Sequence, residues 1–191
     1  MFELHGFAGL IHFPTLYIQD AIRLGQGRFR HIDKGEVILY QGEIASRAYW
    51  VVQGLLRSYS LDSAGKIHVF MFAPEGWIVS DVQSFTFLEP SNLFIDAMEP
   101  TLIIELNQSY LSVQSLNEGD VTHAINKLLR RISILQQRVI MLMSASAAER
   151  YEHFLETYPD LVNRVPLKWI ASYLGITPEA LSTIRGRIKD K

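Results

Sequence analysis

The stretch that decides how this chain is organised is NEGDVTHAINKLLRRISILQQRVIMLM, residues 117–143. Apolar side chains recur in it at alternating spacings of four and three, which is an unbroken heptad seam. Asn117 is a favourable N-cap and no proline interrupts the stretch, so the sequence predicts one helix about 40 Å long. The seam consists of Val121, Ile125, Leu128, Ile132, Leu135, Val139 and Leu142.

This helix carries a second apolar stripe beside the seam, whereas a lone amphipathic surface helix needs only one. The second stripe consists of Leu129, Ile134, Ile140, Met141 and Met143. We interpret the seam as a contact with a second copy of the same helix, and the second stripe as cover for the chain's own core. The alternative is a helix that is fully buried within a monomer.

Composition limits the class of protein. The chain has 191 residues, 48% hydrophobic and 20% charged, so we expect a globular protein of one large or two small domains. Its longest apolar runs are too short to span a bilayer, and no secretory leader is visible. The absence of cysteine excludes disulfides, thiolate metal sites and cysteine-ligated iron–sulfur clusters. We therefore expect a cytoplasmic protein with no membrane partner.

The net charge is unevenly distributed along the chain. From Arg164 to the last residue there are six Lys or Arg and two Asp or Glu, which gives +4. Because the whole chain carries −2, the residues before Arg164 carry −6. A basic end on an acidic body indicates an anionic partner.

Residues 29–107 follow the period of β-strands. Short runs rich in Val, Ile, Phe, Tyr and Trp alternate with turn residues, and the four glycines from Gly42 to Gly76 are eleven or twelve residues apart. This spacing favours antiparallel strands in a jelly-roll over a parallel sheet with crossover helices. The candidate strands are 29–32, 37–40, 48–53, 55–61, 67–73, 77–79, 93–98 and 101–106.

After the long helix, the sequence predicts three shorter helices. Ser146 can cap the first, over residues 147–158. Pro166 can begin the second, and Gly175 supplies a left-handed turn residue after it. Thr177 is an N-cap for the third helix. This order of helix, glycine turn and helix is typical of a DNA-binding helix-turn-helix, and an ordinary helical hairpin is the alternative.

The stretch KGEVILYQGEIASRAYWVVQGLLRSYSLDSAGKIHVFMFAPEGW, residues 34–77, resembles the cyclic-nucleotide-binding β-roll of Crp–Fnr transcription regulators. The matching features are the turns Lys34–Glu36, Gln41–Glu43 and Pro74–Gly76, the strand ending at Gly54 and the hairpin Asp62–Gly65. The resemblance covers roughly residues 28–191 and rests on the order and spacing of these features together.

The resemblance implies an α+β protein with three parts. Residues 1–116 would form an antiparallel β-roll sensor domain of jelly-roll type, and residues 117–143 a long dimerisation helix. Residues 144–191 would form a helix-turn-helix DNA-binding domain without a clear wing.

The ligand pocket is where the chain departs from this family. In the family's cyclic-nucleotide binders, a G-E pair holds a ribose hydroxyl and an R-S or R-T pair holds the phosphate. Here Ser80 and Asp81 stand in place of the first pair, Ser91 and Asn92 in place of the second, and residues 76–96 contain no Lys or Arg. We expect no binding of cyclic AMP, although Asp81 can still bind a diol. Two alternatives follow, a pocket for an unknown, non-phosphorylated small-molecule effector and a filled pocket that binds nothing.

The last helix supplies the candidate DNA contacts. By helical period it buries Leu181, Ile184 and Ile188, which leaves its other face free. Thr183 stands where the family commonly carries an arginine, and no two-stranded wing follows. Arg185 and Arg187 are the candidates to replace that arginine, and contact with phosphates alone is the alternative. The residues placed to face DNA are Lys168, Thr177, Glu179, Ser182, Thr183, Arg185, Arg187 and Lys189.

These features together predict a homodimeric, sequence-specific transcription regulator that is not an enzyme. Its expected partners are double-stranded DNA, a second copy of itself, RNA polymerase and an unknown effector, with no cofactor and no metal. One alternative is a β-roll protein that binds a small molecule and no DNA. Another is a cupin-type enzyme, which the six histidines disfavour because none has metal-ligand spacing.

Overall fold

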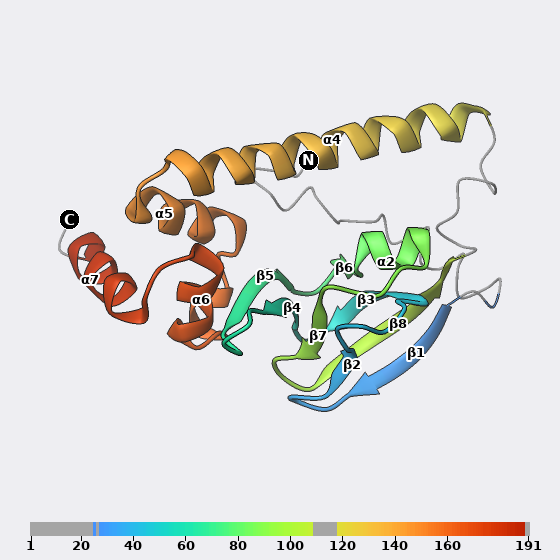
Figure 1. Cartoon of the computed structure of the whole chain (residues 1–191), viewed down its shortest axis with the longest axis horizontal. Coiled ribbons are helices and arrows are strands. Elements are labelled where there is room, and N and C mark those ends of the chain that lie inside the picture. Colours follow the sequence, from blue (N-terminus) through green and yellow to red (C-terminus); the bar gives the residue numbers. More distant parts are fainter. Residues whose placement is uncertain (1–24, 26, 109–117, 190–191) are drawn as a thin grey trace. The chain divides into compact units, whose positions relative to one another are not determined.

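The computed structural model describes Gly25, residues 27–108 and residues 118–189 (Figure 1). The side chains of residues 118–125, 127, 128, 130, 131, 134 and 189 lie outside the described part. Its contacts separate a unit that holds all the strands from a unit that holds the helices after Thr122. The division at residues 116 and 143 stays a prediction.

Eight strands form the first unit, and they coincide with the eight predicted ones to within one or two residues at each end. They are β1 (Gly27–Ile32), β2 (Val37–Leu39), β3 (Arg47–Gln53), β4 (Leu56–Leu61), β5 (Ile67–Ala73), β6 (Ile78–Val79), β7 (Phe94–Ala97) and β8 (Thr101–Asn107). The predicted α+β fold with an N-terminal jelly-roll is confirmed.

The strands pair into two antiparallel sheets of four, in the orders β1-β8-β3-β6 and β2-β7-β4-β5. Apart from the β4–β5 hairpin, neighbours in each sheet are not consecutive in sequence, as in a jelly-roll. The inward side chains form an apolar core whose burial drives folding. Its fully buried members include Val51, Leu55, Leu56, Phe72, Ile95, Ile103 and Leu106.

The turn between β3 and β4 requires glycine. Gly54 has φ 99°, in the left-handed region that side chains avoid. A Cβ at this position would lie 2.6 Å from the Thr101 hydroxyl and 2.7 Å from the Pro100 carbonyl oxygen. The backbone of Gly54 therefore packs directly against the start of β8, which closes this end of the β-roll.

One short helix, α2 (Val82–Phe87), lies between β6 and β7 and was not predicted (Figure 1). It ends at Leu88, which is left-handed with φ 59° and whose N–H donates to the Ser84 carbonyl oxygen. Val82, Phe87 and Leu88 are exposed. The apolar period therefore gave no signal for this helix, because its outer face is as apolar as its inner one.

The second unit consists of α4 (Glu118–Ser144), α5 (Ala147–Thr157), the 3-10 turn η3 (Leu161–Asn163), α6 (Leu167–Leu174) and α7 (Pro178–Lys189). The predicted long helix is confirmed as one continuous helix, and its expected cap Asn117 lies outside the described residues. Ser146 begins α5 as predicted, in a capping box with Glu149 that satisfies both backbone N–H groups.

The short helices pack around an aromatic core. Phe154 on α5 lies 5.6 Å from Tyr173 on α6 and 5.3 Å from Tyr158, between ring centroids. Ile170 on α6 and Leu181 on α7 belong to the same unit and are fully buried. These contacts fix α6 and α7 on α5, so the predicted helix-turn-helix is part of a packed unit.

Candidate functional site

Asp81 is the centre of the predicted ligand pocket, and it is hydrogen-bonded on all sides by this chain. It is the N-cap of α2, and its Oδ1 accepts from the Ser84 N–H at 3.1 Å. Its Oδ2 accepts from the Ser91 hydroxyl at 2.9 Å and from the Asn92 N–H at 3.1 Å. Asp81 is only 6% exposed. A carboxylate buried this far needs such donors, and here the protein itself supplies them.

The loop before β7 is held in place around this carboxylate. Ser91 is buried, and its N–H donates to the Glu43 carbonyl oxygen at 2.8 Å. The Ser91 hydroxyl also accepts from the Leu93 N–H at 3.0 Å. Ser80, in contrast, donates its hydroxyl to the Arg47 carbonyl oxygen at 3.1 Å. The structure therefore brings Asp81, Ser91 and Asn92 together, and directs the Ser80 hydroxyl to the backbone of β3.

This arrangement has a chemical consequence for ligands. The donors at positions 91 and 92, where the family's phosphate group would bind, already serve the Asp81 carboxylate. No Lys or Arg occurs between residues 76 and 96 to balance a second negative charge. A buried anion without a partner is strongly disfavoured, so the geometry opposes a phosphorylated ligand here.

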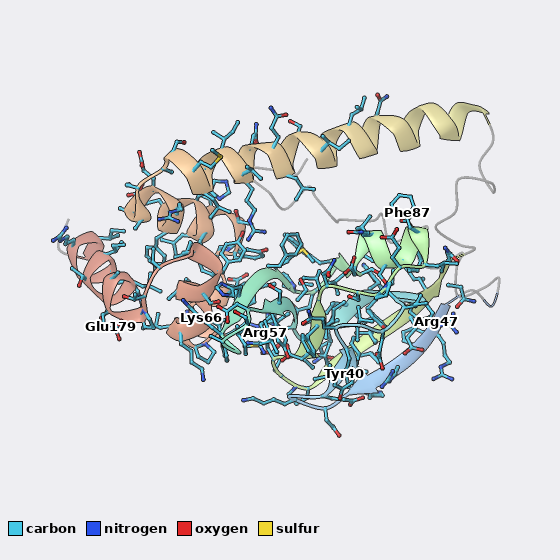
Figure 2. All side chains as sticks on the ribbon, viewed as in Figure 1. Tyr40, Arg47, Arg57, Lys66, Phe87 and Glu179 are labelled. Carbon is cyan, nitrogen blue, oxygen red and sulfur yellow. The ribbon has the colours of Figure 1, made fainter. Side chains whose placement is uncertain are left out.

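Sequence reasoning missed a buried ion pair on the second sheet. Arg57 on β4 faces Asp96 on β7 in the strand register, and the two are 5% and 7% exposed (Figure 2 labels Arg57). The Arg57 Nε donates to Asp96 Oδ1 at 3.0 Å, and its Nη2 bonds to Oδ2. The available signal was a charged residue within each of two apolar strands.

Aromatic rings extend this pair along the same sheet. The Arg57 guanidinium lies 4.5 Å from the Tyr59 ring centroid, and Tyr59 stacks on Phe94 at 5.2 Å. Burial raises the pKa of Tyr59, and the nearby Asp96 charge raises it further. The phenol therefore stays neutral, and the cluster is a desolvated, internally paired part of the β-roll.

A second polar network lies on the first sheet. Arg30 bonds to Glu105 at 2.9 Å and to Glu36 at 2.7 Å. The hydrogen bond to Glu105 is the main cause that raises the pKa of Arg30. Burial and then the Glu105 charge raise the pKa of Tyr49 to about 12, and its hydroxyl donates to the Ile38 carbonyl oxygen at 3.0 Å. These groups fix strands and leave no reactive side chain free.

The seam of α4 is exposed wherever its side chains are described. Ile132, Leu135, Val139 and Leu142 are 42–55% exposed, while the side chains of Val121, Ile125 and Leu128 lie outside the described part. The second stripe was expected to cover the core. Leu129, Ile140 and Met143 of that stripe are exposed. Its role as cover for the chain's own core stays a prediction.

The helix-turn-helix forms through the local chemistry that the sequence indicated. Gly175 is left-handed with φ 67°, and its N–H donates to the Ser172 carbonyl oxygen at 3.1 Å. The Thr177 hydroxyl caps α7 by accepting from the Ala180 N–H at 3.2 Å. Leu181 is fully buried, whereas Ile184 is only half-buried. These groups hold α7 against α6 and leave its other side open.

Most of the predicted DNA-facing residues are exposed on this segment. Lys168 lies on α6, Thr177 in the turn, and the others on α7, where Figure 2 labels Glu179. Arg185 is half-buried, and the side chain of Lys189 lies outside the described part. The Thr183 hydroxyl donates to the Glu179 carbonyl oxygen at 3.1 Å. The exposed ones are Lys168, Thr177, Glu179, Ser182, Thr183 and Arg187.

Within the described ranges, no group of three or more His, Asp or Glu side chains is placed to hold a metal ion. Among the helices of these ranges, none is both long enough and apolar enough to cross a bilayer.

Comparisons with known proteins agree with this fold. Residues 29–113 match the family model of the cyclic nucleotide-binding domain. The nitrogen fixation regulation protein FixK of Bradyrhizobium diazoefficiens is 25% identical over 168 residues, which cover 82% of this chain and 69% of FixK.

Solved structures show the same architecture at lower identity. FixK2 from Bradyrhizobium japonicum superposes with a TM-score of 0.71 at 20% identity, covering 86% of this chain and 85% of FixK2. The c-di-GMP responsive global regulator CLP of Xanthomonas campestris reaches 0.67 at 13% identity, covering 93% of this chain and 92% of CLP. Residues 29–113 therefore match the cyclic nucleotide-binding domain in sequence, and the chain shares the fold of FixK2 and CLP.

Proposed function

We propose that this protein is a sequence-specific, DNA-binding transcription regulator that acts as a cytoplasmic homodimer without cyclic AMP. The observation that carries the proposal is the helix-turn-helix, whose outer side presents Ser182, Thr183 and Arg187. The charge of +4 from Arg164 onward supports an anionic partner, because phosphate neutralisation supplies most non-specific affinity for DNA. RNA polymerase and an effector of unknown identity are part of the same proposal.

The dimer rests on the exposed seam of α4. Burying each leucine would contribute about 1.5–3 kcal/mol, and a two-fold interface uses every seam residue twice. We expect wild-type protein to be a dimer in light scattering at micromolar concentration. Leu135→Asp should give monomers, whereas Gln136→Asp, an exposed change on the adjacent position, should leave the dimer intact. A wild-type monomer would contradict the dimer proposal.

Independence of cyclic AMP rests on the occupied donors around Asp81. The carboxylate already takes the Ser91 hydroxyl and the Asn92 N–H, so a cyclic phosphate would meet a like charge instead of free donors. Calorimetry with cyclic AMP and cyclic GMP should therefore give no heat of binding at micromolar ligand. A micromolar Kd for either nucleotide would refute this part of the proposal.

DNA binding is tested on duplexes selected from a random pool by the wild-type protein. We expect a palindrome with half-sites about one helical turn apart. The selected duplex should bind about 10³-fold or more tightly than a scrambled one at physiological salt. Negligible retention of both duplexes at low salt would favour a β-roll protein that binds a small molecule and no DNA.

Two arginines of α7 are expected to contact DNA in different ways, one at a phosphate and one at a base. Arg187→Ala should weaken binding to all duplexes alike and reduce the salt slope by about one, as loss of a phosphate contact does. Arg185→Ala should instead relax preference at one base step, at a cost of about 1–3 kcal/mol on the selected duplex. Arg28→Ala, a highly exposed arginine of β1, is the matched control and should change neither property. An identical effect of the first two variants would refute this division of roles.

A further inference from the structure

Two arginines from different helices meet the last turn of α6. Arg138, near the end of α4, lies with its guanidinium carbon 4.4 Å from the Tyr173 ring centroid. Arg150 on α5 donates from Nη1 to the Leu174 carbonyl oxygen at 2.7 Å. Tyr173 and Leu174 are the last two residues of α6. Helices α4 and α5 thus hold the same end of α6 through positively charged groups.

The chemistry of this end of α6 suits both contacts. The last carbonyls of a helix lack backbone partners and carry its negative dipole end, which a guanidinium stabilises. Tyr173 is buried against Phe154 and Tyr158, with centroids 5.6 and 5.7 Å away. Because the ring cannot turn without disturbing that core, it is a rigid surface for Arg138.

The charge of Arg138 also acts on a group of α5. Burial is the main cause that lowers the pKa of His153, and the positive charge of Arg138 lowers it as well. The direct contact of Arg138 that carries the argument is the one with Tyr173 on α6. On α5, the carboxylate of Glu156 acts on His153 in the opposite sense.

The held end of α6 leads directly into the turn that orients α7. Gly175 follows Leu174, and a Cβ there would lie 3.5 Å from the Arg150 Nη1. The Ile176 N–H then donates to the Ala171 carbonyl oxygen at 3.0 Å. Any movement of α6 relative to α4 is therefore passed to α7 through a turn with little freedom of its own.

We propose that Arg138 and Arg150 are positioning residues that fix the DNA-reading helix α7 relative to the long helix α4. This arginine clamp sets the separation and orientation of the two reading helices in the dimer, and so the half-site spacing that the protein accepts. The inference rests on the proposed function, because spacing has meaning only for a DNA-binding dimer. Adjacent bases of one strand are about 3.4 Å apart, so a small change in helix position alters the preferred spacing.

The test uses the full-length protein and duplexes with the selected half-sites. Arg138→Gln keeps a polar side chain and removes the charge, and Tyr173→Leu removes the ring. We expect each to weaken binding to the selected duplex by about tenfold, the size of a desolvated cation–π contact. Each should also lose discrimination against a duplex whose spacer is one base pair longer. Tyr173→Phe and Arg138→Lys, which keep a ring and a cation, should retain both properties.

The comparison with scrambled duplexes decides between positioning and direct contact. If Arg138 only positions α7, the affinity of Arg138→Gln for scrambled DNA should stay within about twofold of wild type, since no phosphate contact is lost. Equal weakening on selected and scrambled duplexes would mean that Arg138 contacts DNA itself, and would overturn the proposal. Unchanged affinity and spacing would overturn it too. Light scattering and circular dichroism should confirm that each variant remains folded and dimeric.

A second measurement is independent of DNA. The chain has no cysteine, so spin labels can be attached uniquely at Gln137→Cys on α4 and Ala180→Cys on α7. Excess unlabelled protein isolates the distance within one chain. Adding Arg138→Gln should broaden this distance distribution, and an unchanged distribution would overturn the clamp. If wild-type protein binds no duplex, the proposed function fails, while this distance measurement still decides the clamp.

Discussion

The β-roll and the helix-turn-helix use their polar side chains in opposite ways. In the β-roll, Asp81, Arg57 and Asp96 are buried and bonded to groups of the same chain. On α7, Ser182 and Arg187 are exposed. A buried polar group stabilises a fold only when it is paired, whereas an exposed one costs little and remains available to a partner.

This difference shows where regulation would have to act. An effector that enters the Asp81 cluster must compete with hydrogen bonds that already hold α2 and the loop before β7. A partner that meets α7 finds side chains that are already exposed. The β-roll is therefore closed by its own chemistry, and the outer side of α7 is open.

The largest effect is expected from removing one partner of the buried ion pair, which tests whether polar side chains matter more to stability in the β-roll than on α7. Asp96→Ala leaves Arg57 without its carboxylate in a buried site, which should destabilise the protein by about 3–5 kcal/mol. Urea unfolding measures the change. Glu179→Ala, at an exposed position on α7, is the control and should change the stability far less than Asp96→Ala. A similar loss of unfolding free energy in the two variants would show that the two regions do not differ in how their polar side chains contribute to stability.

The next largest effect concerns Asp81 itself. Asp81→Ala removes the cap of α2 and leaves the N–H groups of Ser84 and Asn92 without an acceptor, at a cost of about 1–3 kcal/mol. Asp81→Asn keeps one acceptor oxygen and should cost less. Urea unfolding again measures both. If Asp81→Ala is as stable as wild type, the cluster is a vacant pocket and not a structural device.

The strands and helix ends could be predicted because their signals are local. The turn glycines recur at regular spacing, and Gly175 and Thr177 act within a few residues of the helices they end or begin. Ser146 and Glu149 form their capping box three residues apart. Such chemistry depends on nearby sequence alone and survives in the folded chain.

The features that sequence reasoning missed depend on contacts between distant residues. Arg57 meets Asp96 only because β4 and β7 align in one register, 39 residues apart. The position of Asp81 predicted a ligand contact, but the donors that occupy its Oδ2 come from a loop ten residues further on. Arg185 was expected to face outward by helical period, and its partial burial reflects packing that no period contains. Sequence identified these residue types, and tertiary structure decided what each one does.

The smallest expected effect is a pH dependence confined to the helical unit. His153 on α5 is half-buried, its ring nitrogen Nδ1 lies 3.2 Å from the Thr157 hydroxyl, and burial is the first cause that lowers its pKa from 6.5. Folding therefore favours the neutral imidazole, and the unfolded chain binds the proton more tightly. The resulting stability is fully present above about pH 6.5 and is lost as the pH falls through the lowered pKa of the folded state.

Hydrogen exchange of α5 and α6 between pH 7.5 and 5.0, corrected for the intrinsic rates, should measure this change. Protection in the wild-type protein should fall with pH, and His153→Gln should remove that part of the fall. His68→Gln, at an exposed position on β5, is the control and should leave the profile of α5 and α6 unchanged. The effect should be small, because a half-exposed imidazole is well screened by water. A His153→Gln profile identical to wild type would show that His153 does not contribute to the pH dependence of α5 and α6.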